Sequence, residues 1–275
     1  MKIWRRALSA SEIQTVYANE NSGLNYDGQP RTCQSCTGVD IEANSWQFIG
    51  VPANGEETLL SLDGLVDTVV DLVGTVGELL GDDMPGALNT DWVIYKRTYS
   101  TTDNSSSYQK LSLTDPIEFG QGYWLGSTVA GRWDVEGLTA VSYDSGHPAC
   151  TAAACAEIDL TPVTLDFSVD ANDGSGPYRY NMSGFIGLES PVDWADCRFL
   201  IDGTAYTPSE ANASGFASKQ IWLYDPSNGG ANSNGYTTCA DDSPGGCKLA
   251  PFKGFWVELH GPTKNKTVKL LIPQE

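Results

Sequence analysis

Three short blocks rich in aromatic residues occur twice along this chain, in the same order and at similar spacing. In one-letter code, WQFIGV, WVIY and FGQGYWL are matched by SGFIGL, IWLY and PFKGFWV, at residues 46–51, 92–95 and 119–125 and again at 183–188, 221–224 and 251–257. Blocks that recur in a fixed order indicate an internal repeat of one structural unit. The sequence therefore predicts two copies of one module, over 38–142 and 160–275, joined by a connector at 143–159.

The repeated blocks are predicted to be β-strands. The runs at 92–96 and 220–224 are short, rich in β-branched and aromatic residues, and bounded by turn-forming Asn, Asp, Pro and Gly, as strands are. The chain of 275 residues contains 29 glycines and 14 prolines, and 19% of its residues are charged. This composition favours many short strands and turns over a helical bundle or disorder. We expect a mainly β fold of two tandem antiparallel β-sandwich-like modules.

One amphipathic helix is predicted within the first module. Residues 59–80 place Leu and Val at helical spacing on one face, and Asp63, Asp67 and Asp71 four apart on another. Three glycines weaken this helix. Two interpretations of its apolar stripe are open, packing on the core of the module and an interface with a partner chain. The first is favoured because such stripes usually serve burial.

The first twenty residues resemble a known family. Ser9 and Glu12 have the spacing of a capping box, and the apolar residues that follow form the stripe of one short helix. The segment KIWRRALS, followed by SEI, resembles the C-terminal end of a laminin-G-like (concanavalin A-like lectin) domain, where a last strand runs into an R-A-L-S-x-x-E-I turn and a short helix. The resemblance implies that residues 1–20 are the tail of such a domain, and residues 21–37 then form a linker.

Seven cysteines indicate an oxidising compartment. Six of them fall in pairs with the spacing of small disulfide-closed loops: Cys33 with Cys36, Cys150 with Cys155, and Cys239 with Cys247. Zinc binding by the first pair would need a second ligand pair, which the sequence lacks. The odd cysteine, Cys197, is expected either to pair with Cys239 or Cys247 or to cross-link to another chain. We therefore expect an extracellular or cell-surface protein.

The charge balance excludes two kinds of partner. With 16 basic and 35 acidic residues, the formal net charge is −19, whereas nucleic-acid backbones and anionic membranes bind clustered Lys and Arg. The most apolar stretch, at 59–80, carries several acidic residues, and charges are costly in lipid. The sequence therefore predicts no nucleic-acid binding and no membrane insertion.

No residue set in the sequence identifies a reaction. The two histidines are His147 and His260, and neither lies near a G-x-S-x-G elbow, which disfavours a Ser-His-Asp or Cys-His nucleophile. Acidic residues are numerous, but nothing marks one pair as the two carboxylates of a glycosidase. We therefore predict no catalytic residues and no enzymatic activity.

The strongest candidate for a cofactor site is the segment at 170–176. Asp170, Asn172 and Asp173 supply oxygen ligands, and the following glycines allow backbone carbonyls to turn inward, which suits calcium. The segment departs from the EF-hand loop because it lacks the spacer between Asn172 and Asp173 and the closing Glu. A plain Asn-Asp-Gly turn is the favoured alternative.

Aromatic residues raise a second hypothesis, stacking on a glycan. Neighbouring residues of a strand face opposite sides, so only one of Tyr123 and Trp124 lines a given surface. Most of the recurring aromatics are assigned to packing, because a shared core requires the same residues in both copies. Tyr108 and Tyr236, in the long loops, are the candidate glycan-binding residues.

These observations favour a non-catalytic role outside the cell. The repeated blocks resemble, loosely, the W…G-x-G-Y-W modules of large bacterial exoproteins, which implies β modules in a secreted protein. We expect a structural or adhesive module of a cell-surface assembly or larger adhesin, with copies of itself or cell-surface proteins as partners. The alternative is a glycan-binding module of a secreted carbohydrate-active protein, with polysaccharide as the ligand.

Overall fold

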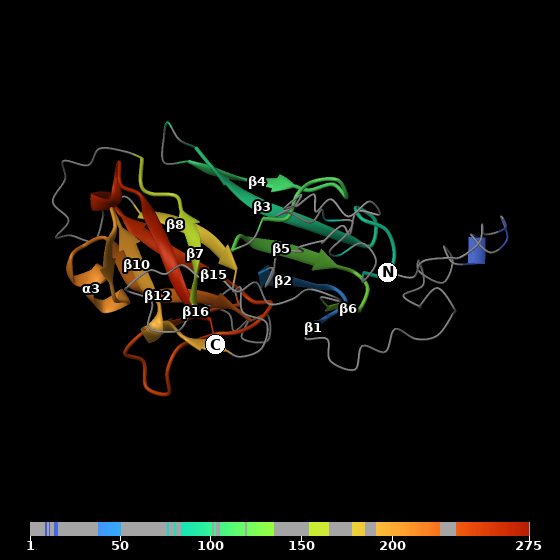
Figure 1. Cartoon of the computed structure of the whole chain (residues 1–275). Coiled ribbons are helices and arrows are strands. Elements are labelled where there is room, and N and C mark those ends of the chain that lie inside the picture. Colours follow the sequence, from blue (N-terminus) through green and yellow to red (C-terminus); the bar gives the residue numbers. More distant parts are fainter. Residues whose placement is uncertain are drawn as a thin grey trace, which may run out of the picture.

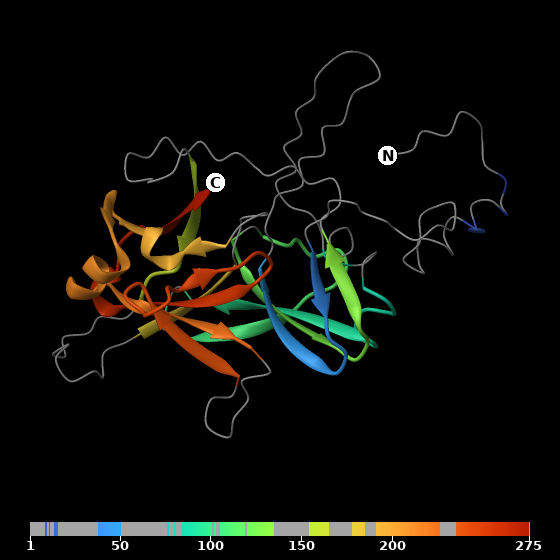
Figure 2. The same cartoon turned by 90° about the horizontal axis from the view of Figure 1, so that it is seen from below.

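The structure is a computed structural model of the chain. It describes residues 38–50, 76, 80, 84–100, 102, 105–118, 120–134, 154–164, 178–184, 191–225 and 235–274, together with residues 9, 11, 14 and 15. Over these residues the fold is mainly β with antiparallel sheets, which confirms the predicted fold class. The two modules lie side by side (Figure 1 and Figure 2). In the part of the chain described, no helix is long and apolar enough to cross a membrane.

The first module is built on an antiparallel sheet with the strand order β2-β5-β3-β4. Its strands are β2 (Ser45–Gly50), β3 (Trp92–Tyr99), β4 (Ser106–Lys110) and β5 (Gly122–Ser127). One face buries Ile49, Ile94 and Tyr123 in what we call the first core. A two-stranded sheet, β1 (Gly38–Ile41) with β6 (Gly131–Asp134), adds Ile41 and Trp133 to this core.

The second module is a sandwich of two four-stranded antiparallel sheets, β13-β12-β15-β8 and β11-β10-β16-β7. The strands are β7 (Ala154–Leu160), β8 (Tyr178–Gly184), β10 (Arg198–Ile201), β11 (Thr204–Tyr206), β12 (Ala217–Tyr224), β13 (Tyr236–Ala240), β15 (Gly254–His260) and β16 (Val268–Gln274). Apolar residues of both sheets form the second core. Trp194 lies at its centre, with its ring centroid 5.7 Å from that of Phe199 and its indole N–H donating to the Lys219 carbonyl.

Shorter elements complete the second module. Strands β9 (Val192–Asp193) and β14 (Lys248–Leu249) pair with each other, and 3-10 turns η1 (Trp194–Asp196) and η3 (Gly261–Thr263) follow β9 and β15. Helix α3 (Pro208–Ala213) was not predicted. It begins with a capping box, in which the Thr207 hydroxyl accepts from the Glu210 N–H and the Glu210 carboxylate accepts from the Thr207 N–H.

The predicted connector at 143–159 has a different boundary in the structure, and most of the predicted helix at 59–80 lies outside the described residues. Strand β7 pairs with β16 along its length, so the second module includes residues that the sequence analysis assigned to the connector at 143–159. Of the predicted helix at 59–80, only Val76 and Leu80 are described, and both are fully buried in the first core. The Leu80 N–H donates to the Val76 carbonyl, as in a helical turn. At these two residues the apolar stripe packs on the core.

The two large sheets have the same strand order, because β2-β5-β3-β4 corresponds to β8-β15-β12-β13. Pairing register defines which positions are equivalent. Gly50 faces Gly122 in the first sheet, and Gly184 faces Gly254 in the second. The FGQGYWL and PFKGFWV blocks are therefore in register as predicted. The sequence alignment of the WQFIGV block was wrong by three residues, because it matched Gly50 with Gly187. The alignment of the WVIY block was wrong by two residues, because it matched Tyr95 with Tyr224, whereas the register makes Tyr95 equivalent to Trp222.

One predicted cysteine pair is confirmed and one expectation is wrong. Cys239 and Cys247 form a disulfide across the loop after β13. Cys155 is also disulfide-bonded, and its predicted partner Cys150 lies outside the described residues, as do Cys33 and Cys36. Cys197 neither pairs with Cys239 or Cys247 nor is accessible to another chain, because it is a free thiol buried in the second core.

Candidate functional site

The modules join where β2 and β5 of the first sheet meet β8 and β15 of the second (Figure 1). The Gly50 N–H donates to the Phe252 carbonyl at 3.1 Å, and the Gly184 N–H donates to the Gly120 carbonyl at 2.8 Å. Since Gly50 is equivalent to Gly184 and Phe252 to Gly120, these two bonds are equivalent. Two single bridges between the modules, Ile49 with Lys253 and Gln121 with Ser183, repeat the same relation. The junction thus has approximate two-fold symmetry.

Glycines at the junction allow the backbones to approach closely. A Cβ atom at Gly184 would lie 2.5 Å from the Gly50 Cα atom, and one at Gly254 would overlap the ring of Phe48. Any larger residue at either position would push the two modules apart. Phe48 is 2% exposed as a result.

The residues equivalent by symmetry, Phe252 and Gly120, differ in side chain. Both have left-handed backbones, with φ of 60° and 74°, a conformation that is uncommon for a bulky residue. Phe252 nevertheless places its ring in the first core, 1% exposed and 5.0 Å from the ring of Trp133. The second module therefore completes the core of the first.

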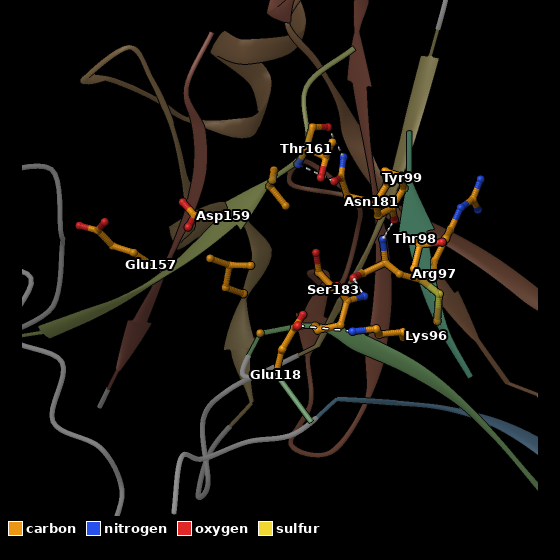
Figure 3. Close-up of a pocket in the computed structure, with 15 residues that line it drawn as sticks. Lys96, Arg97, Thr98, Tyr99, Glu118, Glu157, Asp159, Thr161, Asn181 and Ser183 are labelled. Carbon is orange, nitrogen blue, oxygen red and sulfur yellow. Dashed lines mark hydrogen bonds and ion pairs between the residues drawn. The ribbon is translucent and has the colours of Figure 1, made fainter. Parts of the chain in front are cut away.

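On the Gly120 side of the junction lies a cavity of about 510 Å³ between β3, β7 and β8 (Figure 3). We call it the junction cavity. Polar side chains line it, and several are already paired. Lys96 Nζ lies 3.4 Å from Glu118 Oε1, and the Asn181 amide both accepts from the Thr161 N–H and donates to its carbonyl. Its size suits a small polar ligand.

Tyr99 connects the two modules at the edge of the junction cavity (Figure 3). Its phenol oxygen accepts from the Met182 N–H at 2.7 Å, and the Arg179 guanidinium lies 5.4 Å from its ring. Burial raises the pKa of Tyr99 to about 12. The phenol therefore stays neutral near pH 7 and acts as a fixed contact rather than as an acid or base.

The outer faces of the two sheets pack on each other through aromatic rings. We define the junction aromatic cluster as Phe48, Trp124, Trp256, Tyr224 and Tyr236. Phe48 lies between the two tryptophans, at 5.1 Å from Trp124 and 5.4 Å from Trp256, and Trp124 meets Tyr224 edge-on at 4.7 Å. Trp124 lies in this cluster while Tyr123 is buried in the first core, so the predicted alternation of these two residues is confirmed.

Arg97 extends the cluster toward solvent. Its guanidinium lies 4.9 Å from the Trp256 ring centroid and 5.8 Å from that of Tyr108, and its Nε donates to the Ser106 hydroxyl at 2.9 Å. Cation–π contacts of this kind contribute most where they are shielded from water. Among the described residues, no carboxylate forms an ion pair with Arg97.

The structure brings the two predicted glycan-binding residues, Tyr108 and Tyr236, to equivalent positions. Tyr108 faces Arg97 across the β3–β4 pair, and Tyr236 faces Tyr224 across the β12–β13 pair. Tyr108 is 51% exposed and Tyr236 is half-buried. Burial raises the pKa of Tyr236, and the nearby phenol of Tyr108 raises it further. Both residues therefore border one aromatic surface around Arg97.

The predicted calcium ligands lie outside the described residues, and the calcium hypothesis stays a prediction. These ligands are Asp170, Asn172 and Asp173. Within the described ranges, no group of three or more His, Cys, Asp or Glu residues is placed to hold a metal ion. His260 contacts Glu258 at 3.1 Å and the ring of Tyr178 edge-on. A thermal melt with and without EDTA tests calcium binding, and an unchanged melting temperature would contradict it.

Sequence reasoning missed three residues that shape these surfaces, namely Arg97, Phe252 and Trp46. Trp46 had a detectable signal, since alternation along β2 puts it on the same face as Phe48, opposite Ile49. The roles of Arg97 and Phe252 depend on contacts between distant strands and had no local signal.

Comparison with known proteins adds no relative. No family model, no curated protein and no solved structure matches this chain.

Proposed function

We propose that this chain is a non-catalytic structural or adhesive module of an extracellular assembly, in which the two β modules act as one rigid unit. The observation that carries the proposal is the junction, where Phe252 of the second module fills the core of the first. Two modules that share a core resist separation under load, because pulling them apart exposes apolar surface. An adhesin or surface scaffold needs this property.

Two further features support an extracellular location. Disulfides involve Cys239, Cys247 and Cys155, and such bonds persist in oxidising compartments. The net charge of −19 keeps a protein soluble and limits non-specific association. The shared strand order of the two large sheets supports the further proposal that one module arose by duplication of the other.

Adhesion of coated beads tests the structural role. Beads that carry the whole chain should cohere with one another or adhere to cells that display the natural assembly, and they should resist detachment by flow. Beads that carry the Phe252→Ala variant should detach at lower flow, because the modules separate. A chain that stays monomeric at high concentration and retains no beads would contradict the proposal.

Glycan binding is the second candidate function. It is favoured by the surface around Arg97, where Tyr108 and Tyr236 present exposed or half-buried rings at equivalent positions. Aromatic faces and a guanidinium are groups that orient ligands in concave sites. Titration with polysaccharides should quench tryptophan fluorescence through Trp256, which contacts Arg97. The Tyr108→Ala variant should weaken the quenching, and a chain that binds no saccharide would contradict this function.

A further inference from the structure

A rigid aromatic surface lies on the first sheet, away from the junction aromatic cluster. Trp46 is 46% exposed, although its indole is held by the backbone of Gly126. A Cβ atom at Gly126 would lie 2.9 Å from two carbons of the six-membered ring, so one face of the indole rests on the glycine. The Tyr95 ring lies beside it, with centroids 6.1 Å apart. Part of the indole remains open to solvent.

A hollow of about 330 Å³ beside the indole is bordered by polar groups. Asn44 and Thr90 are exposed, and their side chains form no hydrogen bond with any described residue. Asp91 is fixed in place, because its Oδ2 accepts from the Ala87 N–H at 2.7 Å and its carbonyl accepts from both the N–H and the hydroxyl of Thr128. The hollow therefore combines a fixed backbone with donors and acceptors that are still unpaired.

We propose that this hollow, which we call the Trp46 site, binds one ring of a neutral saccharide. A sugar ring offers an apolar C–H face for the indole and hydroxyl groups for Asn44, Thr90 and Asp91. Asp91 is the one charged residue among those that line the hollow, and together with the net charge of −19 it disfavours an acidic sugar. The inference rests on glycan binding, the second candidate function, and adds the Trp46 site as a further contact for the same ligand.

The equivalent position in the second sheet carries a related aromatic pair. By pairing register, Tyr180 and Trp222 correspond to Trp46 and Tyr95. Tyr180 is 37% exposed, and its ring meets that of Trp222 edge-on at 5.3 Å. The second pair differs because Glu258 replaces Gly126, and burial together with Glu258 raises the pKa of Tyr180 to about 12. A polysaccharide that contacts both pairs gains avidity from the rigid junction.

A different role for Trp46 makes a different prediction. An aromatic side chain often covers a glycine in a sheet, where it stabilises the strand pairing. In that case, the loss of the indole would lower stability and leave saccharide binding unaffected. The experiment must therefore measure binding and stability on the same variants.

Affinity electrophoresis in gels that contain a soluble neutral β-glucan, mannan or xylan measures binding, and circular dichroism melts measure stability. The whole chain should be retarded by at least one of these polymers. The Trp46→Ala variant should bind about tenfold more weakly, because it loses the stacking surface. The Asn44→Ala and Thr90→Val variants keep the indole and should each bind about fivefold more weakly through one lost hydrogen bond. Leu113→Ala, which removes an exposed apolar side chain outside the hollow, is the control and should bind as the unmodified chain does.

The outcomes separate this inference from the broader function. Absence of retardation by every neutral polymer would overturn the Trp46 site, and so would unchanged binding of Trp46→Ala. Loss of binding in Tyr108→Ala but not in Trp46→Ala would overturn it while leaving glycan binding in place. If Trp46→Ala has a lowered melting temperature, the Asn44→Ala and Thr90→Val variants become the test of binding. Both variants keep the contact between the Trp46 indole and Gly126. An oligosaccharide too short to contact both aromatic pairs should bind more weakly than the polymer, and Tyr180→Ala should remove that difference.

Discussion

The two sides of the junction have equivalent backbones but different side chains at the equivalent positions Phe252 and Gly120. On one side Phe252 places its ring in the first core, and on the other Gly120 lies against the side chain of Ile158 in β7, next to the polar junction cavity. Within the described residues the two modules also differ in their sheets, since the second contains two four-stranded sheets and the first contains one, together with the two-stranded sheet of β1 and β6. The second module contributes Phe252 to the first core, whereas the second core contains no residue of the first module among those described. Two sheets of the same strand order therefore depend on each other to different degrees.

The largest expected effect comes from removing the side chain of Phe252, which the second module contributes to the first core. Phe252→Ala should destabilise the first module by about 3–5 kcal/mol, because it leaves a cavity next to Trp133. The stability of the second module should change little. Urea unfolding followed by far-UV circular dichroism should change from one transition to two. A single transition with an unchanged midpoint would show that the first module does not depend on Phe252.

The disulfide of the second module gives the next effect. Replacing Cys239 and Cys247 by Ser removes a cross-link with a sequence separation of 8 residues, which should cost about 2.5 kcal/mol in the chain-entropy treatment. In the Phe252→Ala background, where the two modules should unfold separately, the loss should appear in the transition of the second module alone. Equal shifts of both transitions in that background would contradict this prediction.

Crowding the junction should destabilise both modules together. Gly184→Ala places a Cβ atom against Gly50 and should cost about 1–3 kcal/mol through backbone displacement. Gly203→Ala is the control, because nothing lies within 4 Å of its added carbon, although its φ of 81° is left-handed. Thermal melts compare the two variants. A Gly184→Ala variant that melts at the temperature of the unmodified chain would show that the close approach does not limit the junction.

Acid should have the smallest effect, and mostly on the second module. There the pKa values of Asp202, Glu210 and Asp242 are lowered, chiefly by hydrogen bonds, as with Lys266 at Asp202. In the first module the pKa of Asp115 is lowered in the same way. A carboxyl with a lowered pKa contributes stability above its ordinary pKa, and that stability is lost as pH falls through the lowered value.

Melts of the Phe252→Ala variant between pH 7 and pH 3 measure this effect, because its two modules should unfold separately. The second module should lose more of its melting temperature below about pH 4. High salt should reduce the difference, because all four carboxyls are near the surface. An equal loss in both modules would contradict the assignment.

Local chemistry made much of the fold predictable. The Gly-aromatic-Trp sequence of β5 and β15 fixes a close approach, a buried ring and an outward ring in three consecutive residues, so these blocks aligned correctly. The WQFIGV block was misaligned because the sequence offers two glycines, Gly184 and Gly187, three residues apart. The sequence alone does not decide which of them is equivalent to Gly50. Helix α3 had a readable signal in Thr207 and Glu210, the ends of a capping box.

The site was less predictable because its contacts are non-local. Tyr108 and Tyr236 were chosen as loop aromatics, yet they lie on strands, and their common surface arises from the packing of two sheets. The left-handed backbone of Phe252 is set by the turn before β15 and by the core that receives its ring. Nothing in the local sequence at Phe252 indicates that partner.

The unpaired thiol of Cys197 gives the second module a reporter of its own opening. Burial raises the pKa of this thiol, so the reactive thiolate is scarce in the folded state. A thiol reagent therefore labels Cys197 only in molecules whose second core has opened. Under conditions where closing is faster than labelling, the labelling rate counts how often that core opens in solution.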